Sequence, residues 1–186
     1  MSIDAREAHV RRLNALLGAA LYVVIIIHVL LGCAMLLTGA YIPVLKLFAR
    51  AAVVLAAVHL LLGIVFFARS CRGGSVFKHP GLNKRFWAQR ISALGVLAIV
   101  FWHAGSFGGV TANGYELFSW DPARLGLSLL FVACLGVHLV TSAPALMLSA
   151  GISCGPRAQR AVQCLLGALA LACALAFCIY AKVMWA

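Results

Sequence analysis

Acidic residues are scarce in this sequence, whose 186 residues include 4 Asp and Glu against 15 Lys and Arg. Charged residues of all kinds make up 10% of the chain, whereas 65% is hydrophobic and the mean hydropathy is +1.05. These values lie far outside the composition of soluble globular domains. The scarcity of charge therefore excludes an ordinary soluble protein and indicates that lipid is the main solvent of the chain.

The chain also lacks the short motifs that hold common cofactors. It has no glycine-rich motif for a dinucleotide or a phosphate. Its 7 cysteines include no CxxC pair and no CxxCH motif, which argues against an iron–sulfur cluster and against covalently attached haem. Any haem would thus be bound non-covalently, and any flavin or iron–sulfur centre would belong to another polypeptide.

Long apolar runs are what the sequence has in abundance, and a membrane span needs about 20 such residues. The gaps between the runs are short, which predicts antiparallel neighbours in one all-α transmembrane bundle and a single domain over residues 1–186. The first run is too long for a signal peptide and has no small-residue cleavage pattern, so we expect a retained helix. The five predicted spans are residues 13–38, 48–69, 88–106, 124–150 and 161–183.

The distribution of Lys and Arg predicts the orientation of this bundle. Eleven cations flank one side of the predicted spans and four flank the other, so the positive-inside rule places the N-terminus in the cytoplasm and the C-terminus outside. No basic face interleaved with aromatic residues occurs outside the spans, and nucleic-acid binding is not expected. The larger group is Arg6, Arg11, Arg12, Arg69, Arg72, Lys78, Lys84, Arg85, Arg90, Arg157 and Arg160, and the smaller is Lys46, Arg50, Arg124 and Lys182.

Four histidines lie inside the apolar runs, one on each of the first four predicted helices. A single intramembrane histidine can serve in an interhelical hydrogen bond, in a proton relay or as a metal ligand. Four on four helices favour ligation, because two haems with two axial imidazoles each would use all of them. The predicted haem ligands are His28, His59, His103 and His138.

Depth in the membrane predicts how these histidines pair. His28 and His103 lie roughly 20–24 Å beyond the cationic starts of two outward-running helices, at about 1.5 Å per residue. His59 lies about 15 Å, and His138 roughly 20 Å, from the cytoplasmic ends of two returning helices. We therefore expect His28 to pair with His103 in the outer half, and His59 with His138 nearer the cytoplasm.

Small residues support the presence of a flat macrocycle between helices. Gly32, Gly63 and Ser142 each follow a candidate ligand by four residues and so share its helix face. Ordinary small-residue packing of membrane helices is the alternative explanation. Pro144 should bend the fourth helix six residues after its histidine, either tilting the ligand or serving only as a packing kink.

Two polar residues at the start of the third predicted helix are candidate haem contacts. Arg90 lies at the cytoplasmic boundary, where a guanidinium could bind a haem propionate or a partner protein, or act only as a topological anchor. Ser92 follows it by two residues, in the first turns of the same predicted helix. We include both as candidate cofactor-binding residues.

Three stretches of the chain resemble the five-helix, dihaem cytochrome b membrane subunit of succinate dehydrogenases and fumarate reductases. "RRLNALLG" (11–18) is similar to the basic start of that family's first helix, and "QRISALGVLAIVFWH" (89–103) resembles its third helix with a ligand histidine. "GPRAQR" (155–160) resembles the turn into a fifth helix without a ligand. The ordered set of one histidine on each of the first four helices carries most of the resemblance.

The resemblance implies a function as well as a fold. It implies a membrane anchor of the bacterial inner membrane, with haem b at His59/His138 proximal to an iron–sulfur subunit and haem b at His28/His103 distal. It also implies a flavoprotein partner that interconverts succinate and fumarate, and a quinone, usually menaquinone. Catalysis on the dicarboxylate would then belong to the partner, and this chain would be the quinone-reactive subunit of a respiratory oxidoreductase.

The sequence departs from some relatives in having no acidic residue within a span. Both acids of the predicted outer loop, Glu116 and Asp121, lie outside the helices, so a transmembrane carboxylate route for protons is not expected. Three alternatives stay open: a cytochrome b subunit of a hydrogenase, formate dehydrogenase or nitrate reductase, a transporter with a histidine proton relay, and a structural anchor without haem. The first tends to carry two ligands on one helix, which no helix here has.

Overall fold

The structure is a computed structural model, and its helices account for nearly all of the chain that it describes. The described residues are 3–72, 83–106, 110–111, 114–115, 122–152 and 154–185. Within these ranges the helices are α1 (Ile3–Thr38), α2 (Val44–Arg72), α4 (Lys84–Ser106), α5 (Pro122–Ser149) and α6 (Pro156–Trp185). Two-residue strands β1 (Val110–Thr111) and β2 (Gly114–Tyr115) pair in antiparallel fashion between α4 and α5.

The prediction of membrane-length helices is confirmed. Over the described ranges, five helices are long and apolar enough to cross a membrane. The helices extend further than the predicted spans at several ends, because polar and charged residues that flank an apolar run can continue the same helix into the interface. The candidate spans are Arg12–Thr38, Val44–Arg69, Lys84–Ser106, Pro122–Ser149 and Pro156–Val183. The short strand pair was not predicted.

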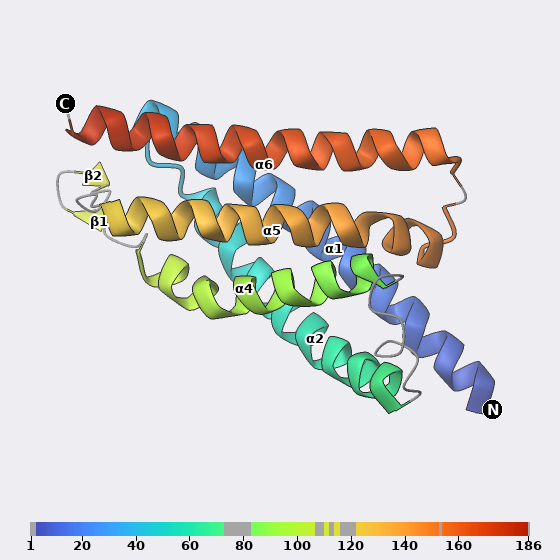
Figure 1. The fold of residues 1–186 in the computed structure, drawn as a ribbon. Helices are drawn as coiled ribbons and strands as arrows, with labels where there is room; N and C mark the ends of the chain where they lie inside the picture. Colours follow the sequence, from blue (N-terminus) through green and yellow to red (C-terminus); the bar gives the residue numbers. More distant parts are fainter. Residues whose placement is uncertain are drawn as a thin grey trace.

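Successive helices run in opposite directions, as the short connections require. One end of the bundle holds the N-terminus, the C-terminal end of α2, the start of α4 and the connection from α5 to α6 (Figure 1). The other end holds the α1–α2 connection, the strand pair and the C-terminus (Figure 1). Among the described residues, Arg72, Lys84, Arg157 and Arg160 of the larger group of cations therefore lie at the end that carries the N-terminus.

Glycine and proline mark the helix ends. Gly39 follows α1 with a φ of 67°, and Gly151 follows α5 with a φ of 79°, a left-handed conformation that glycine adopts without steric cost. At the end of α5, the amide of Ile152 donates to the carbonyl of Met147 at 2.9 Å, which closes a Schellman motif. Pro156 is the first residue of α6, where its missing N–H leaves no helical bond unmade.

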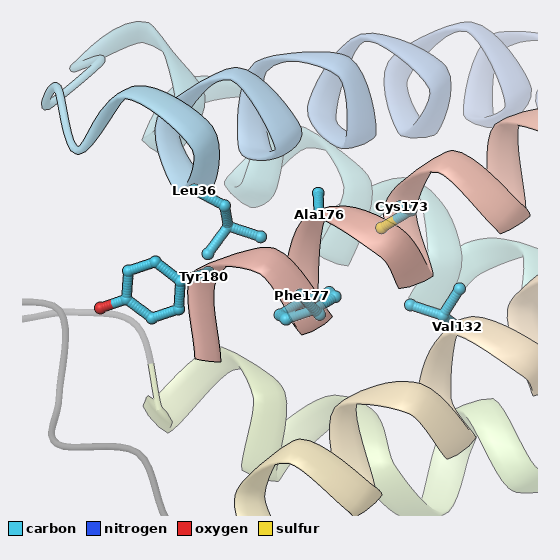
Figure 2. Packing of buried hydrophobic residues seen from close by; sticks show 6 residues of the cluster. All are labelled: Leu36, Val132, Cys173, Ala176, Phe177 and Tyr180. Carbon is cyan, nitrogen blue, oxygen red and sulfur yellow. The ribbon is translucent and has the colours of Figure 1, made fainter. Parts of the chain in front are cut away.

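The core of the bundle lies between α1, α5 and α6. Figure 2 shows Leu36 of α1 and Val132 of α5 directed toward Phe177 and its neighbours on α6. A second cluster contains Leu139 and Ala143 of α5 with Leu166 of α6. These helices approach closely at small residues, which is the usual way that membrane helices pack.

The two remaining helices, α2 and α4, lie outside this core, and each packs against a different core helix. The backbone of α2 packs against α1, and that of α4 packs against α5. Within the described helices, no Cα atom of α4 comes within 8 Å of a Cα atom of α1, and none of α2 comes within 8 Å of α4, α5 or α6. Helices α1 and α4, and likewise α2 and α5, are therefore separated at the level of the backbone.

Candidate functional site

The imidazole rings of His28 and His103 lie next to each other although they come from separated helices. Their ring centroids are 6.3 Å apart and the ring planes meet at 81°. Two imidazoles bound to one metal through bonds of about 2.0–2.1 Å place their centroids roughly 6 Å apart. The spacing of this pair matches the requirement for two axial ligands of one iron.

The ring of His103 is held in place by the neighbouring helix. It stacks on Phe131 of α5, with centroids 4.8 Å apart and planes inclined by 21°. Phe131 is buried, and stacked aromatic pairs of this kind fix a ring in one orientation. Sequence reasoning missed Phe131, because an apolar aromatic residue in an apolar helix carries no local signal of its contact.

The other two histidines also come together, beside a cation. His59 of α2, His138 of α5 and Arg90 of α4 lie close enough to interact electrostatically. Each of the three comes from a different helix, and α2 does not pack its backbone against either of the others. The rings of His28 and His103 thus lie side by side, and His59 and His138 lie within range of an electrostatic interaction. In each case the two histidines belong to helices whose backbones are apart.

A backbone carbonyl of α4 orients His138. Nδ1 of His138 lies 3.1 Å from the carbonyl oxygen of Gln89. Because a carbonyl oxygen only accepts, Nδ1 carries the proton and Nε2 keeps a lone pair. A histidine that donates one ring N–H to a carbonyl and presents the other nitrogen is the usual arrangement of a metal-ligating imidazole. Sequence reasoning could not assign this role to a backbone atom.

Two further ring nitrogens are buried without protein partners. Among the described residues, no hydrogen-bond partner lies near Nδ1 of His28 or Nδ1 of His59. The His28 ring also forms a hydrogen bond with the backbone of Leu45 on α2, so it makes one interhelical contact while its Nδ1 stays unpaired, which is costly away from water. Within the described part of the chain, it is these two Nδ1 atoms that are left without a protein partner and available to a bound group.

The two pairs lie at different levels of the bundle. Gln89, which contacts His138, and His103 are both on α4, and 14 residues separate them in sequence. At 1.5 Å per residue, that separation is about 21 Å along the helix axis. Gln89 lies near the start of α4 and His103 near its end, so the His59/His138 pair is nearer the N-terminal end of the bundle.

Two aromatic residues pack against the guanidinium of Arg90 near His59 and His138. Its guanidinium carbon lies 5.6 Å from the ring centroid of Phe67 on α2 and 5.2 Å from that of Phe86 on α4, which are cation–π distances. Its Nε is buried and, among the described residues, has no hydrogen-bond partner. Arg90 can therefore accept an anionic group such as a carboxylate beside His59 and His138.

Ser92 is buried, and its hydroxyl is engaged within its own helix. The hydroxyl lies 2.6 Å from the carbonyl oxygen of Ala88 and 3.1 Å from that of Gln89. Ser92 therefore shares the Gln89 carbonyl with His138. A direct contact between Ser92 and a cofactor stays a prediction.

Gly32, Gly63 and Ser142, the small residues predicted to leave room for a macrocycle, have two different surroundings in the structure. A Cβ added at Gly32 or Gly63 would meet no atom within 4 Å, which is the space that a flat group beside His28 or His59 needs. Ser142 is used differently, since its Oγ donates to the carbonyl of His138 and lies 2.5 Å from the hydroxyl of Tyr22. Ser142 therefore takes part in packing between α5 and α1.

The histidine pairs suit a metal that brings most of its ligands with it. Across the described part of the chain, no three or more His, Cys, Asp or Glu side chains gather as a metal-binding group. A zinc site needs three or four protein ligands, whereas the iron of haem takes its equatorial ligands from the macrocycle and one or two from the protein. Pairs of imidazoles with open space beside two of them therefore fit haem.

Glu116 and Asp121 lie outside the described residues. The described helices contain four His residues within the candidate spans, one each on α1, α2, α4 and α5.

Comparisons of the chain with protein-family models, with curated proteins and with solved structures found no match.

Proposed function

We propose that this chain is a multi-pass membrane subunit that holds two b haems and passes electrons between a cytoplasmic partner and membrane quinone. The partner would be the iron–sulfur and flavoprotein pair of a succinate dehydrogenase or fumarate reductase, and the quinone menaquinone. The membrane would be the bacterial inner membrane. One haem b would be held by His28 and His103, and the other by His59 and His138.

One observation carries this proposal. Each histidine pair joins two helices that do not pack together, and in the outer pair the rings are 6.3 Å apart. Direct interhelical hydrogen bonds would draw such helices into contact, whereas a macrocycle between two axial ligands keeps them apart. Helix α5 packs against both α1 and α4, and α1 packs against both α2 and α5, so the helix separation alone does not require a bound group. The support for the proposal is the 6.3 Å spacing of the His28 and His103 rings across helices that do not pack together.

The protein's own residues would hold and tune the redox groups. Bound haem would supply one-electron chemistry at iron, with a potential set by axial ligands, hydrogen bonds and burial. The Gln89 carbonyl fixes the tautomer of His138, Phe131 fixes the ring of His103, and Arg90 offers a cation to a propionate. Apolar helices exclude water from both levels.

The proposed orientation follows from charge. The N-terminal end of the bundle would face the cytoplasm, because most cations flank it. The exposed cations Arg72, Lys84, Arg157 and Arg160 lie at that end and suit a soluble partner with an acidic surface. The pair of His59 and His138 would then be proximal to that partner, and the pair of His28 and His103 distal.

The test is the haem content of the purified chain and of single substitutions. Pyridine haemochrome analysis should give about two haems b per chain. His103→Ala and His138→Ala should each remove one b-type signal and leave the other, whereas His79→Ala, in a polar stretch outside the spans, should keep both. Identification of co-purifying subunits then tests the assignment to a succinate or fumarate enzyme.

Three results would contradict the proposal in different ways. A colourless protein would favour the proton-relay transporter or a structural anchor. An unchanged spectrum in His103→Ala would reject the pairing. Two haems with hydrogenase or formate dehydrogenase subunits as partners would keep the electron-transfer role and reject the succinate assignment.

A further inference from the structure

Pro144 leaves a carbonyl group without its helical partner in the last third of α5. Proline has no N–H, so the carbonyl of the residue four positions earlier, Val140, loses its usual bond. In this structure Nε2 of Gln163 on α6 donates to that carbonyl oxygen at 3.0 Å. A side chain from another helix thus replaces the missing backbone donor.

The neighbouring carbonyls are engaged in the same way by two other helices. Nε of Arg85 on α4 donates to the carbonyl oxygen of Thr141 at 2.7 Å. The hydroxyl of Tyr22 on α1 donates to the carbonyl oxygen of Leu139 at 2.6 Å. Three consecutive carbonyls of α5 therefore accept hydrogen bonds from α1, α6 and α4.

This turn begins at a candidate haem ligand. His138 directly precedes the three carbonyls, and its own carbonyl accepts from Ser142 Oγ. Figure 1 shows the last turns of α5 bending away from the line of the preceding turns, as expected where proline interrupts the ladder of backbone bonds. A change in this bend would change the direction in which His138 leaves the helix.

We propose that Tyr22, Arg85 and Gln163 are positioning residues that clamp the Pro144 bend of α5 and so set the direction of His138. The clamp is a property of the fold, and its effect on the haem at His59/His138 rests on the proposed function. Gln163 is the main donor, because it bonds to the carbonyl that proline deprives of a partner. This role also gives α6, which carries no histidine within its span, a part in shaping the site.

The test is a double-substitution cycle between Gln163 and Pro144. Gln163→Met keeps the length of the side chain and removes its hydrogen-bond donors. This variant should shift the EPR signal and midpoint potential of the haem at His59/His138 and leave the other haem unchanged. It should also lower the resistance of the protein to unfolding by SDS. Pro144→Ala restores a backbone N–H for Val140. In the Pro144→Ala background, Gln163→Met should therefore have an effect several-fold smaller on both measurements.

The control is Gln159→Met, because Gln159 lies on the same helix and its Nε2 donates to the Cys154 carbonyl at 3.3 Å, away from the bend. It should shift neither haem. Equal effects of Gln163→Met in both backgrounds, or equal shifts of both haems, would overturn the proposal. If Gln163→Met does not fold, recovery of folded protein by the added Pro144→Ala supports the clamp, and no recovery overturns it.

The two readouts separate this inference from the proposed function. If the purified protein holds no haem, the proposed function fails, while the SDS unfolding cycle still tests the clamp. If haem is present and the unfolding cycle shows no coupling between the two positions, the clamp fails and the proposed function stands.

Discussion

At the scale of single residues, several polar atoms inside the bundle are bonded to a named backbone group, and several others have no hydrogen-bond partner among the described residues. Tyr22, Ser142 and Gln163 belong to the first kind, whereas ring nitrogens of His28 and His59 belong to the second. In lipid an unbonded polar group is unfavourable. Under the proposed function, a bound haem would occupy the surroundings of the second kind, beside His28 and His59.

Gly32→Leu tests the open space beside His28. Because a Cβ at Gly32 meets no protein atom within 4 Å, the larger side chain should fold without strain in the absence of a cofactor. It should nevertheless lower the content of the distal haem, which needs the same space. Haem content and SDS unfolding of the haem-free chain are the measurements, and a full complement of two haems would contradict the expectation.

Tyr22→Phe tests the bond between α1 and α5 by removing one hydroxyl. We expect a loss of about 0.6 kcal/mol of unfolding free energy, the average for hydrogen bonds between membrane helices. Ser106→Ala is the matched control, because within the described part of the chain Ser106 Oγ donates to the Trp102 carbonyl of its own helix, at 2.8 Å. SDS titration of both variants gives the comparison, and equal losses would show that the interhelical bond has no special role.

At the scale of the helices, close approach and separation are decided by small residues. A Cβ added at Gly136 would lie 2.8 Å from Cβ of Ala170, and one at Gly95 would lie 2.5 Å from Sγ of Cys134. These contacts join α5 to α6 and α4 to α5. Gly32 and Gly63, where nothing is near, lie on the sides of α1 and α2 that carry histidines.

Gly136→Ala should destabilise the contact of α5 with α6. The added methyl group overlaps a rigid neighbour, and overpacking costs about 1–3 kcal/mol, which exceeds the roughly 1 kcal/mol that alanine gains over glycine in a helix. Gly126→Ala, also on α5, meets nothing within 4 Å and should be neutral or stabilising. Unfolding free energies in mixed micelles check both, and a stable Gly136→Ala would show that the helices separate without cost.

At the scale of the whole molecule, charge and packing together organise the bundle. The core of α1, α5 and α6 carries one histidine of each pair, and the flanking helices α2 and α4 carry the other. Each candidate haem would thus lie between a core helix and a flanking helix. The exposed cations Arg72, Lys84, Arg157 and Arg160 lie at the end nearer the His59/His138 pair, which is the end where the proposed partner would dock.

The orientation can be tested by labelling intact cells with a membrane-impermeant maleimide. In a chain that keeps only Cys154, between α5 and α6, labelling should occur only after the membrane is made permeable. In a cysteine-free chain carrying Lys182→Cys near the end of α6, labelling should occur in intact cells. The opposite pattern would place the basic end outside and reject the proposed docking side.

The sequence alone determined the number and approximate positions of the spanning helices, because about 20 apolar residues are needed to cross lipid and only a helix satisfies its own backbone there. It also placed a histidine on each of four helices. Only the tertiary structure decided which helices pack and which stay apart, that His103 stacks on Phe131, and that Gln163 bonds at the Pro144 bend. Those features depend on atoms far apart in the chain, including backbone carbonyls that every residue has, so no local pattern of side chains encodes them.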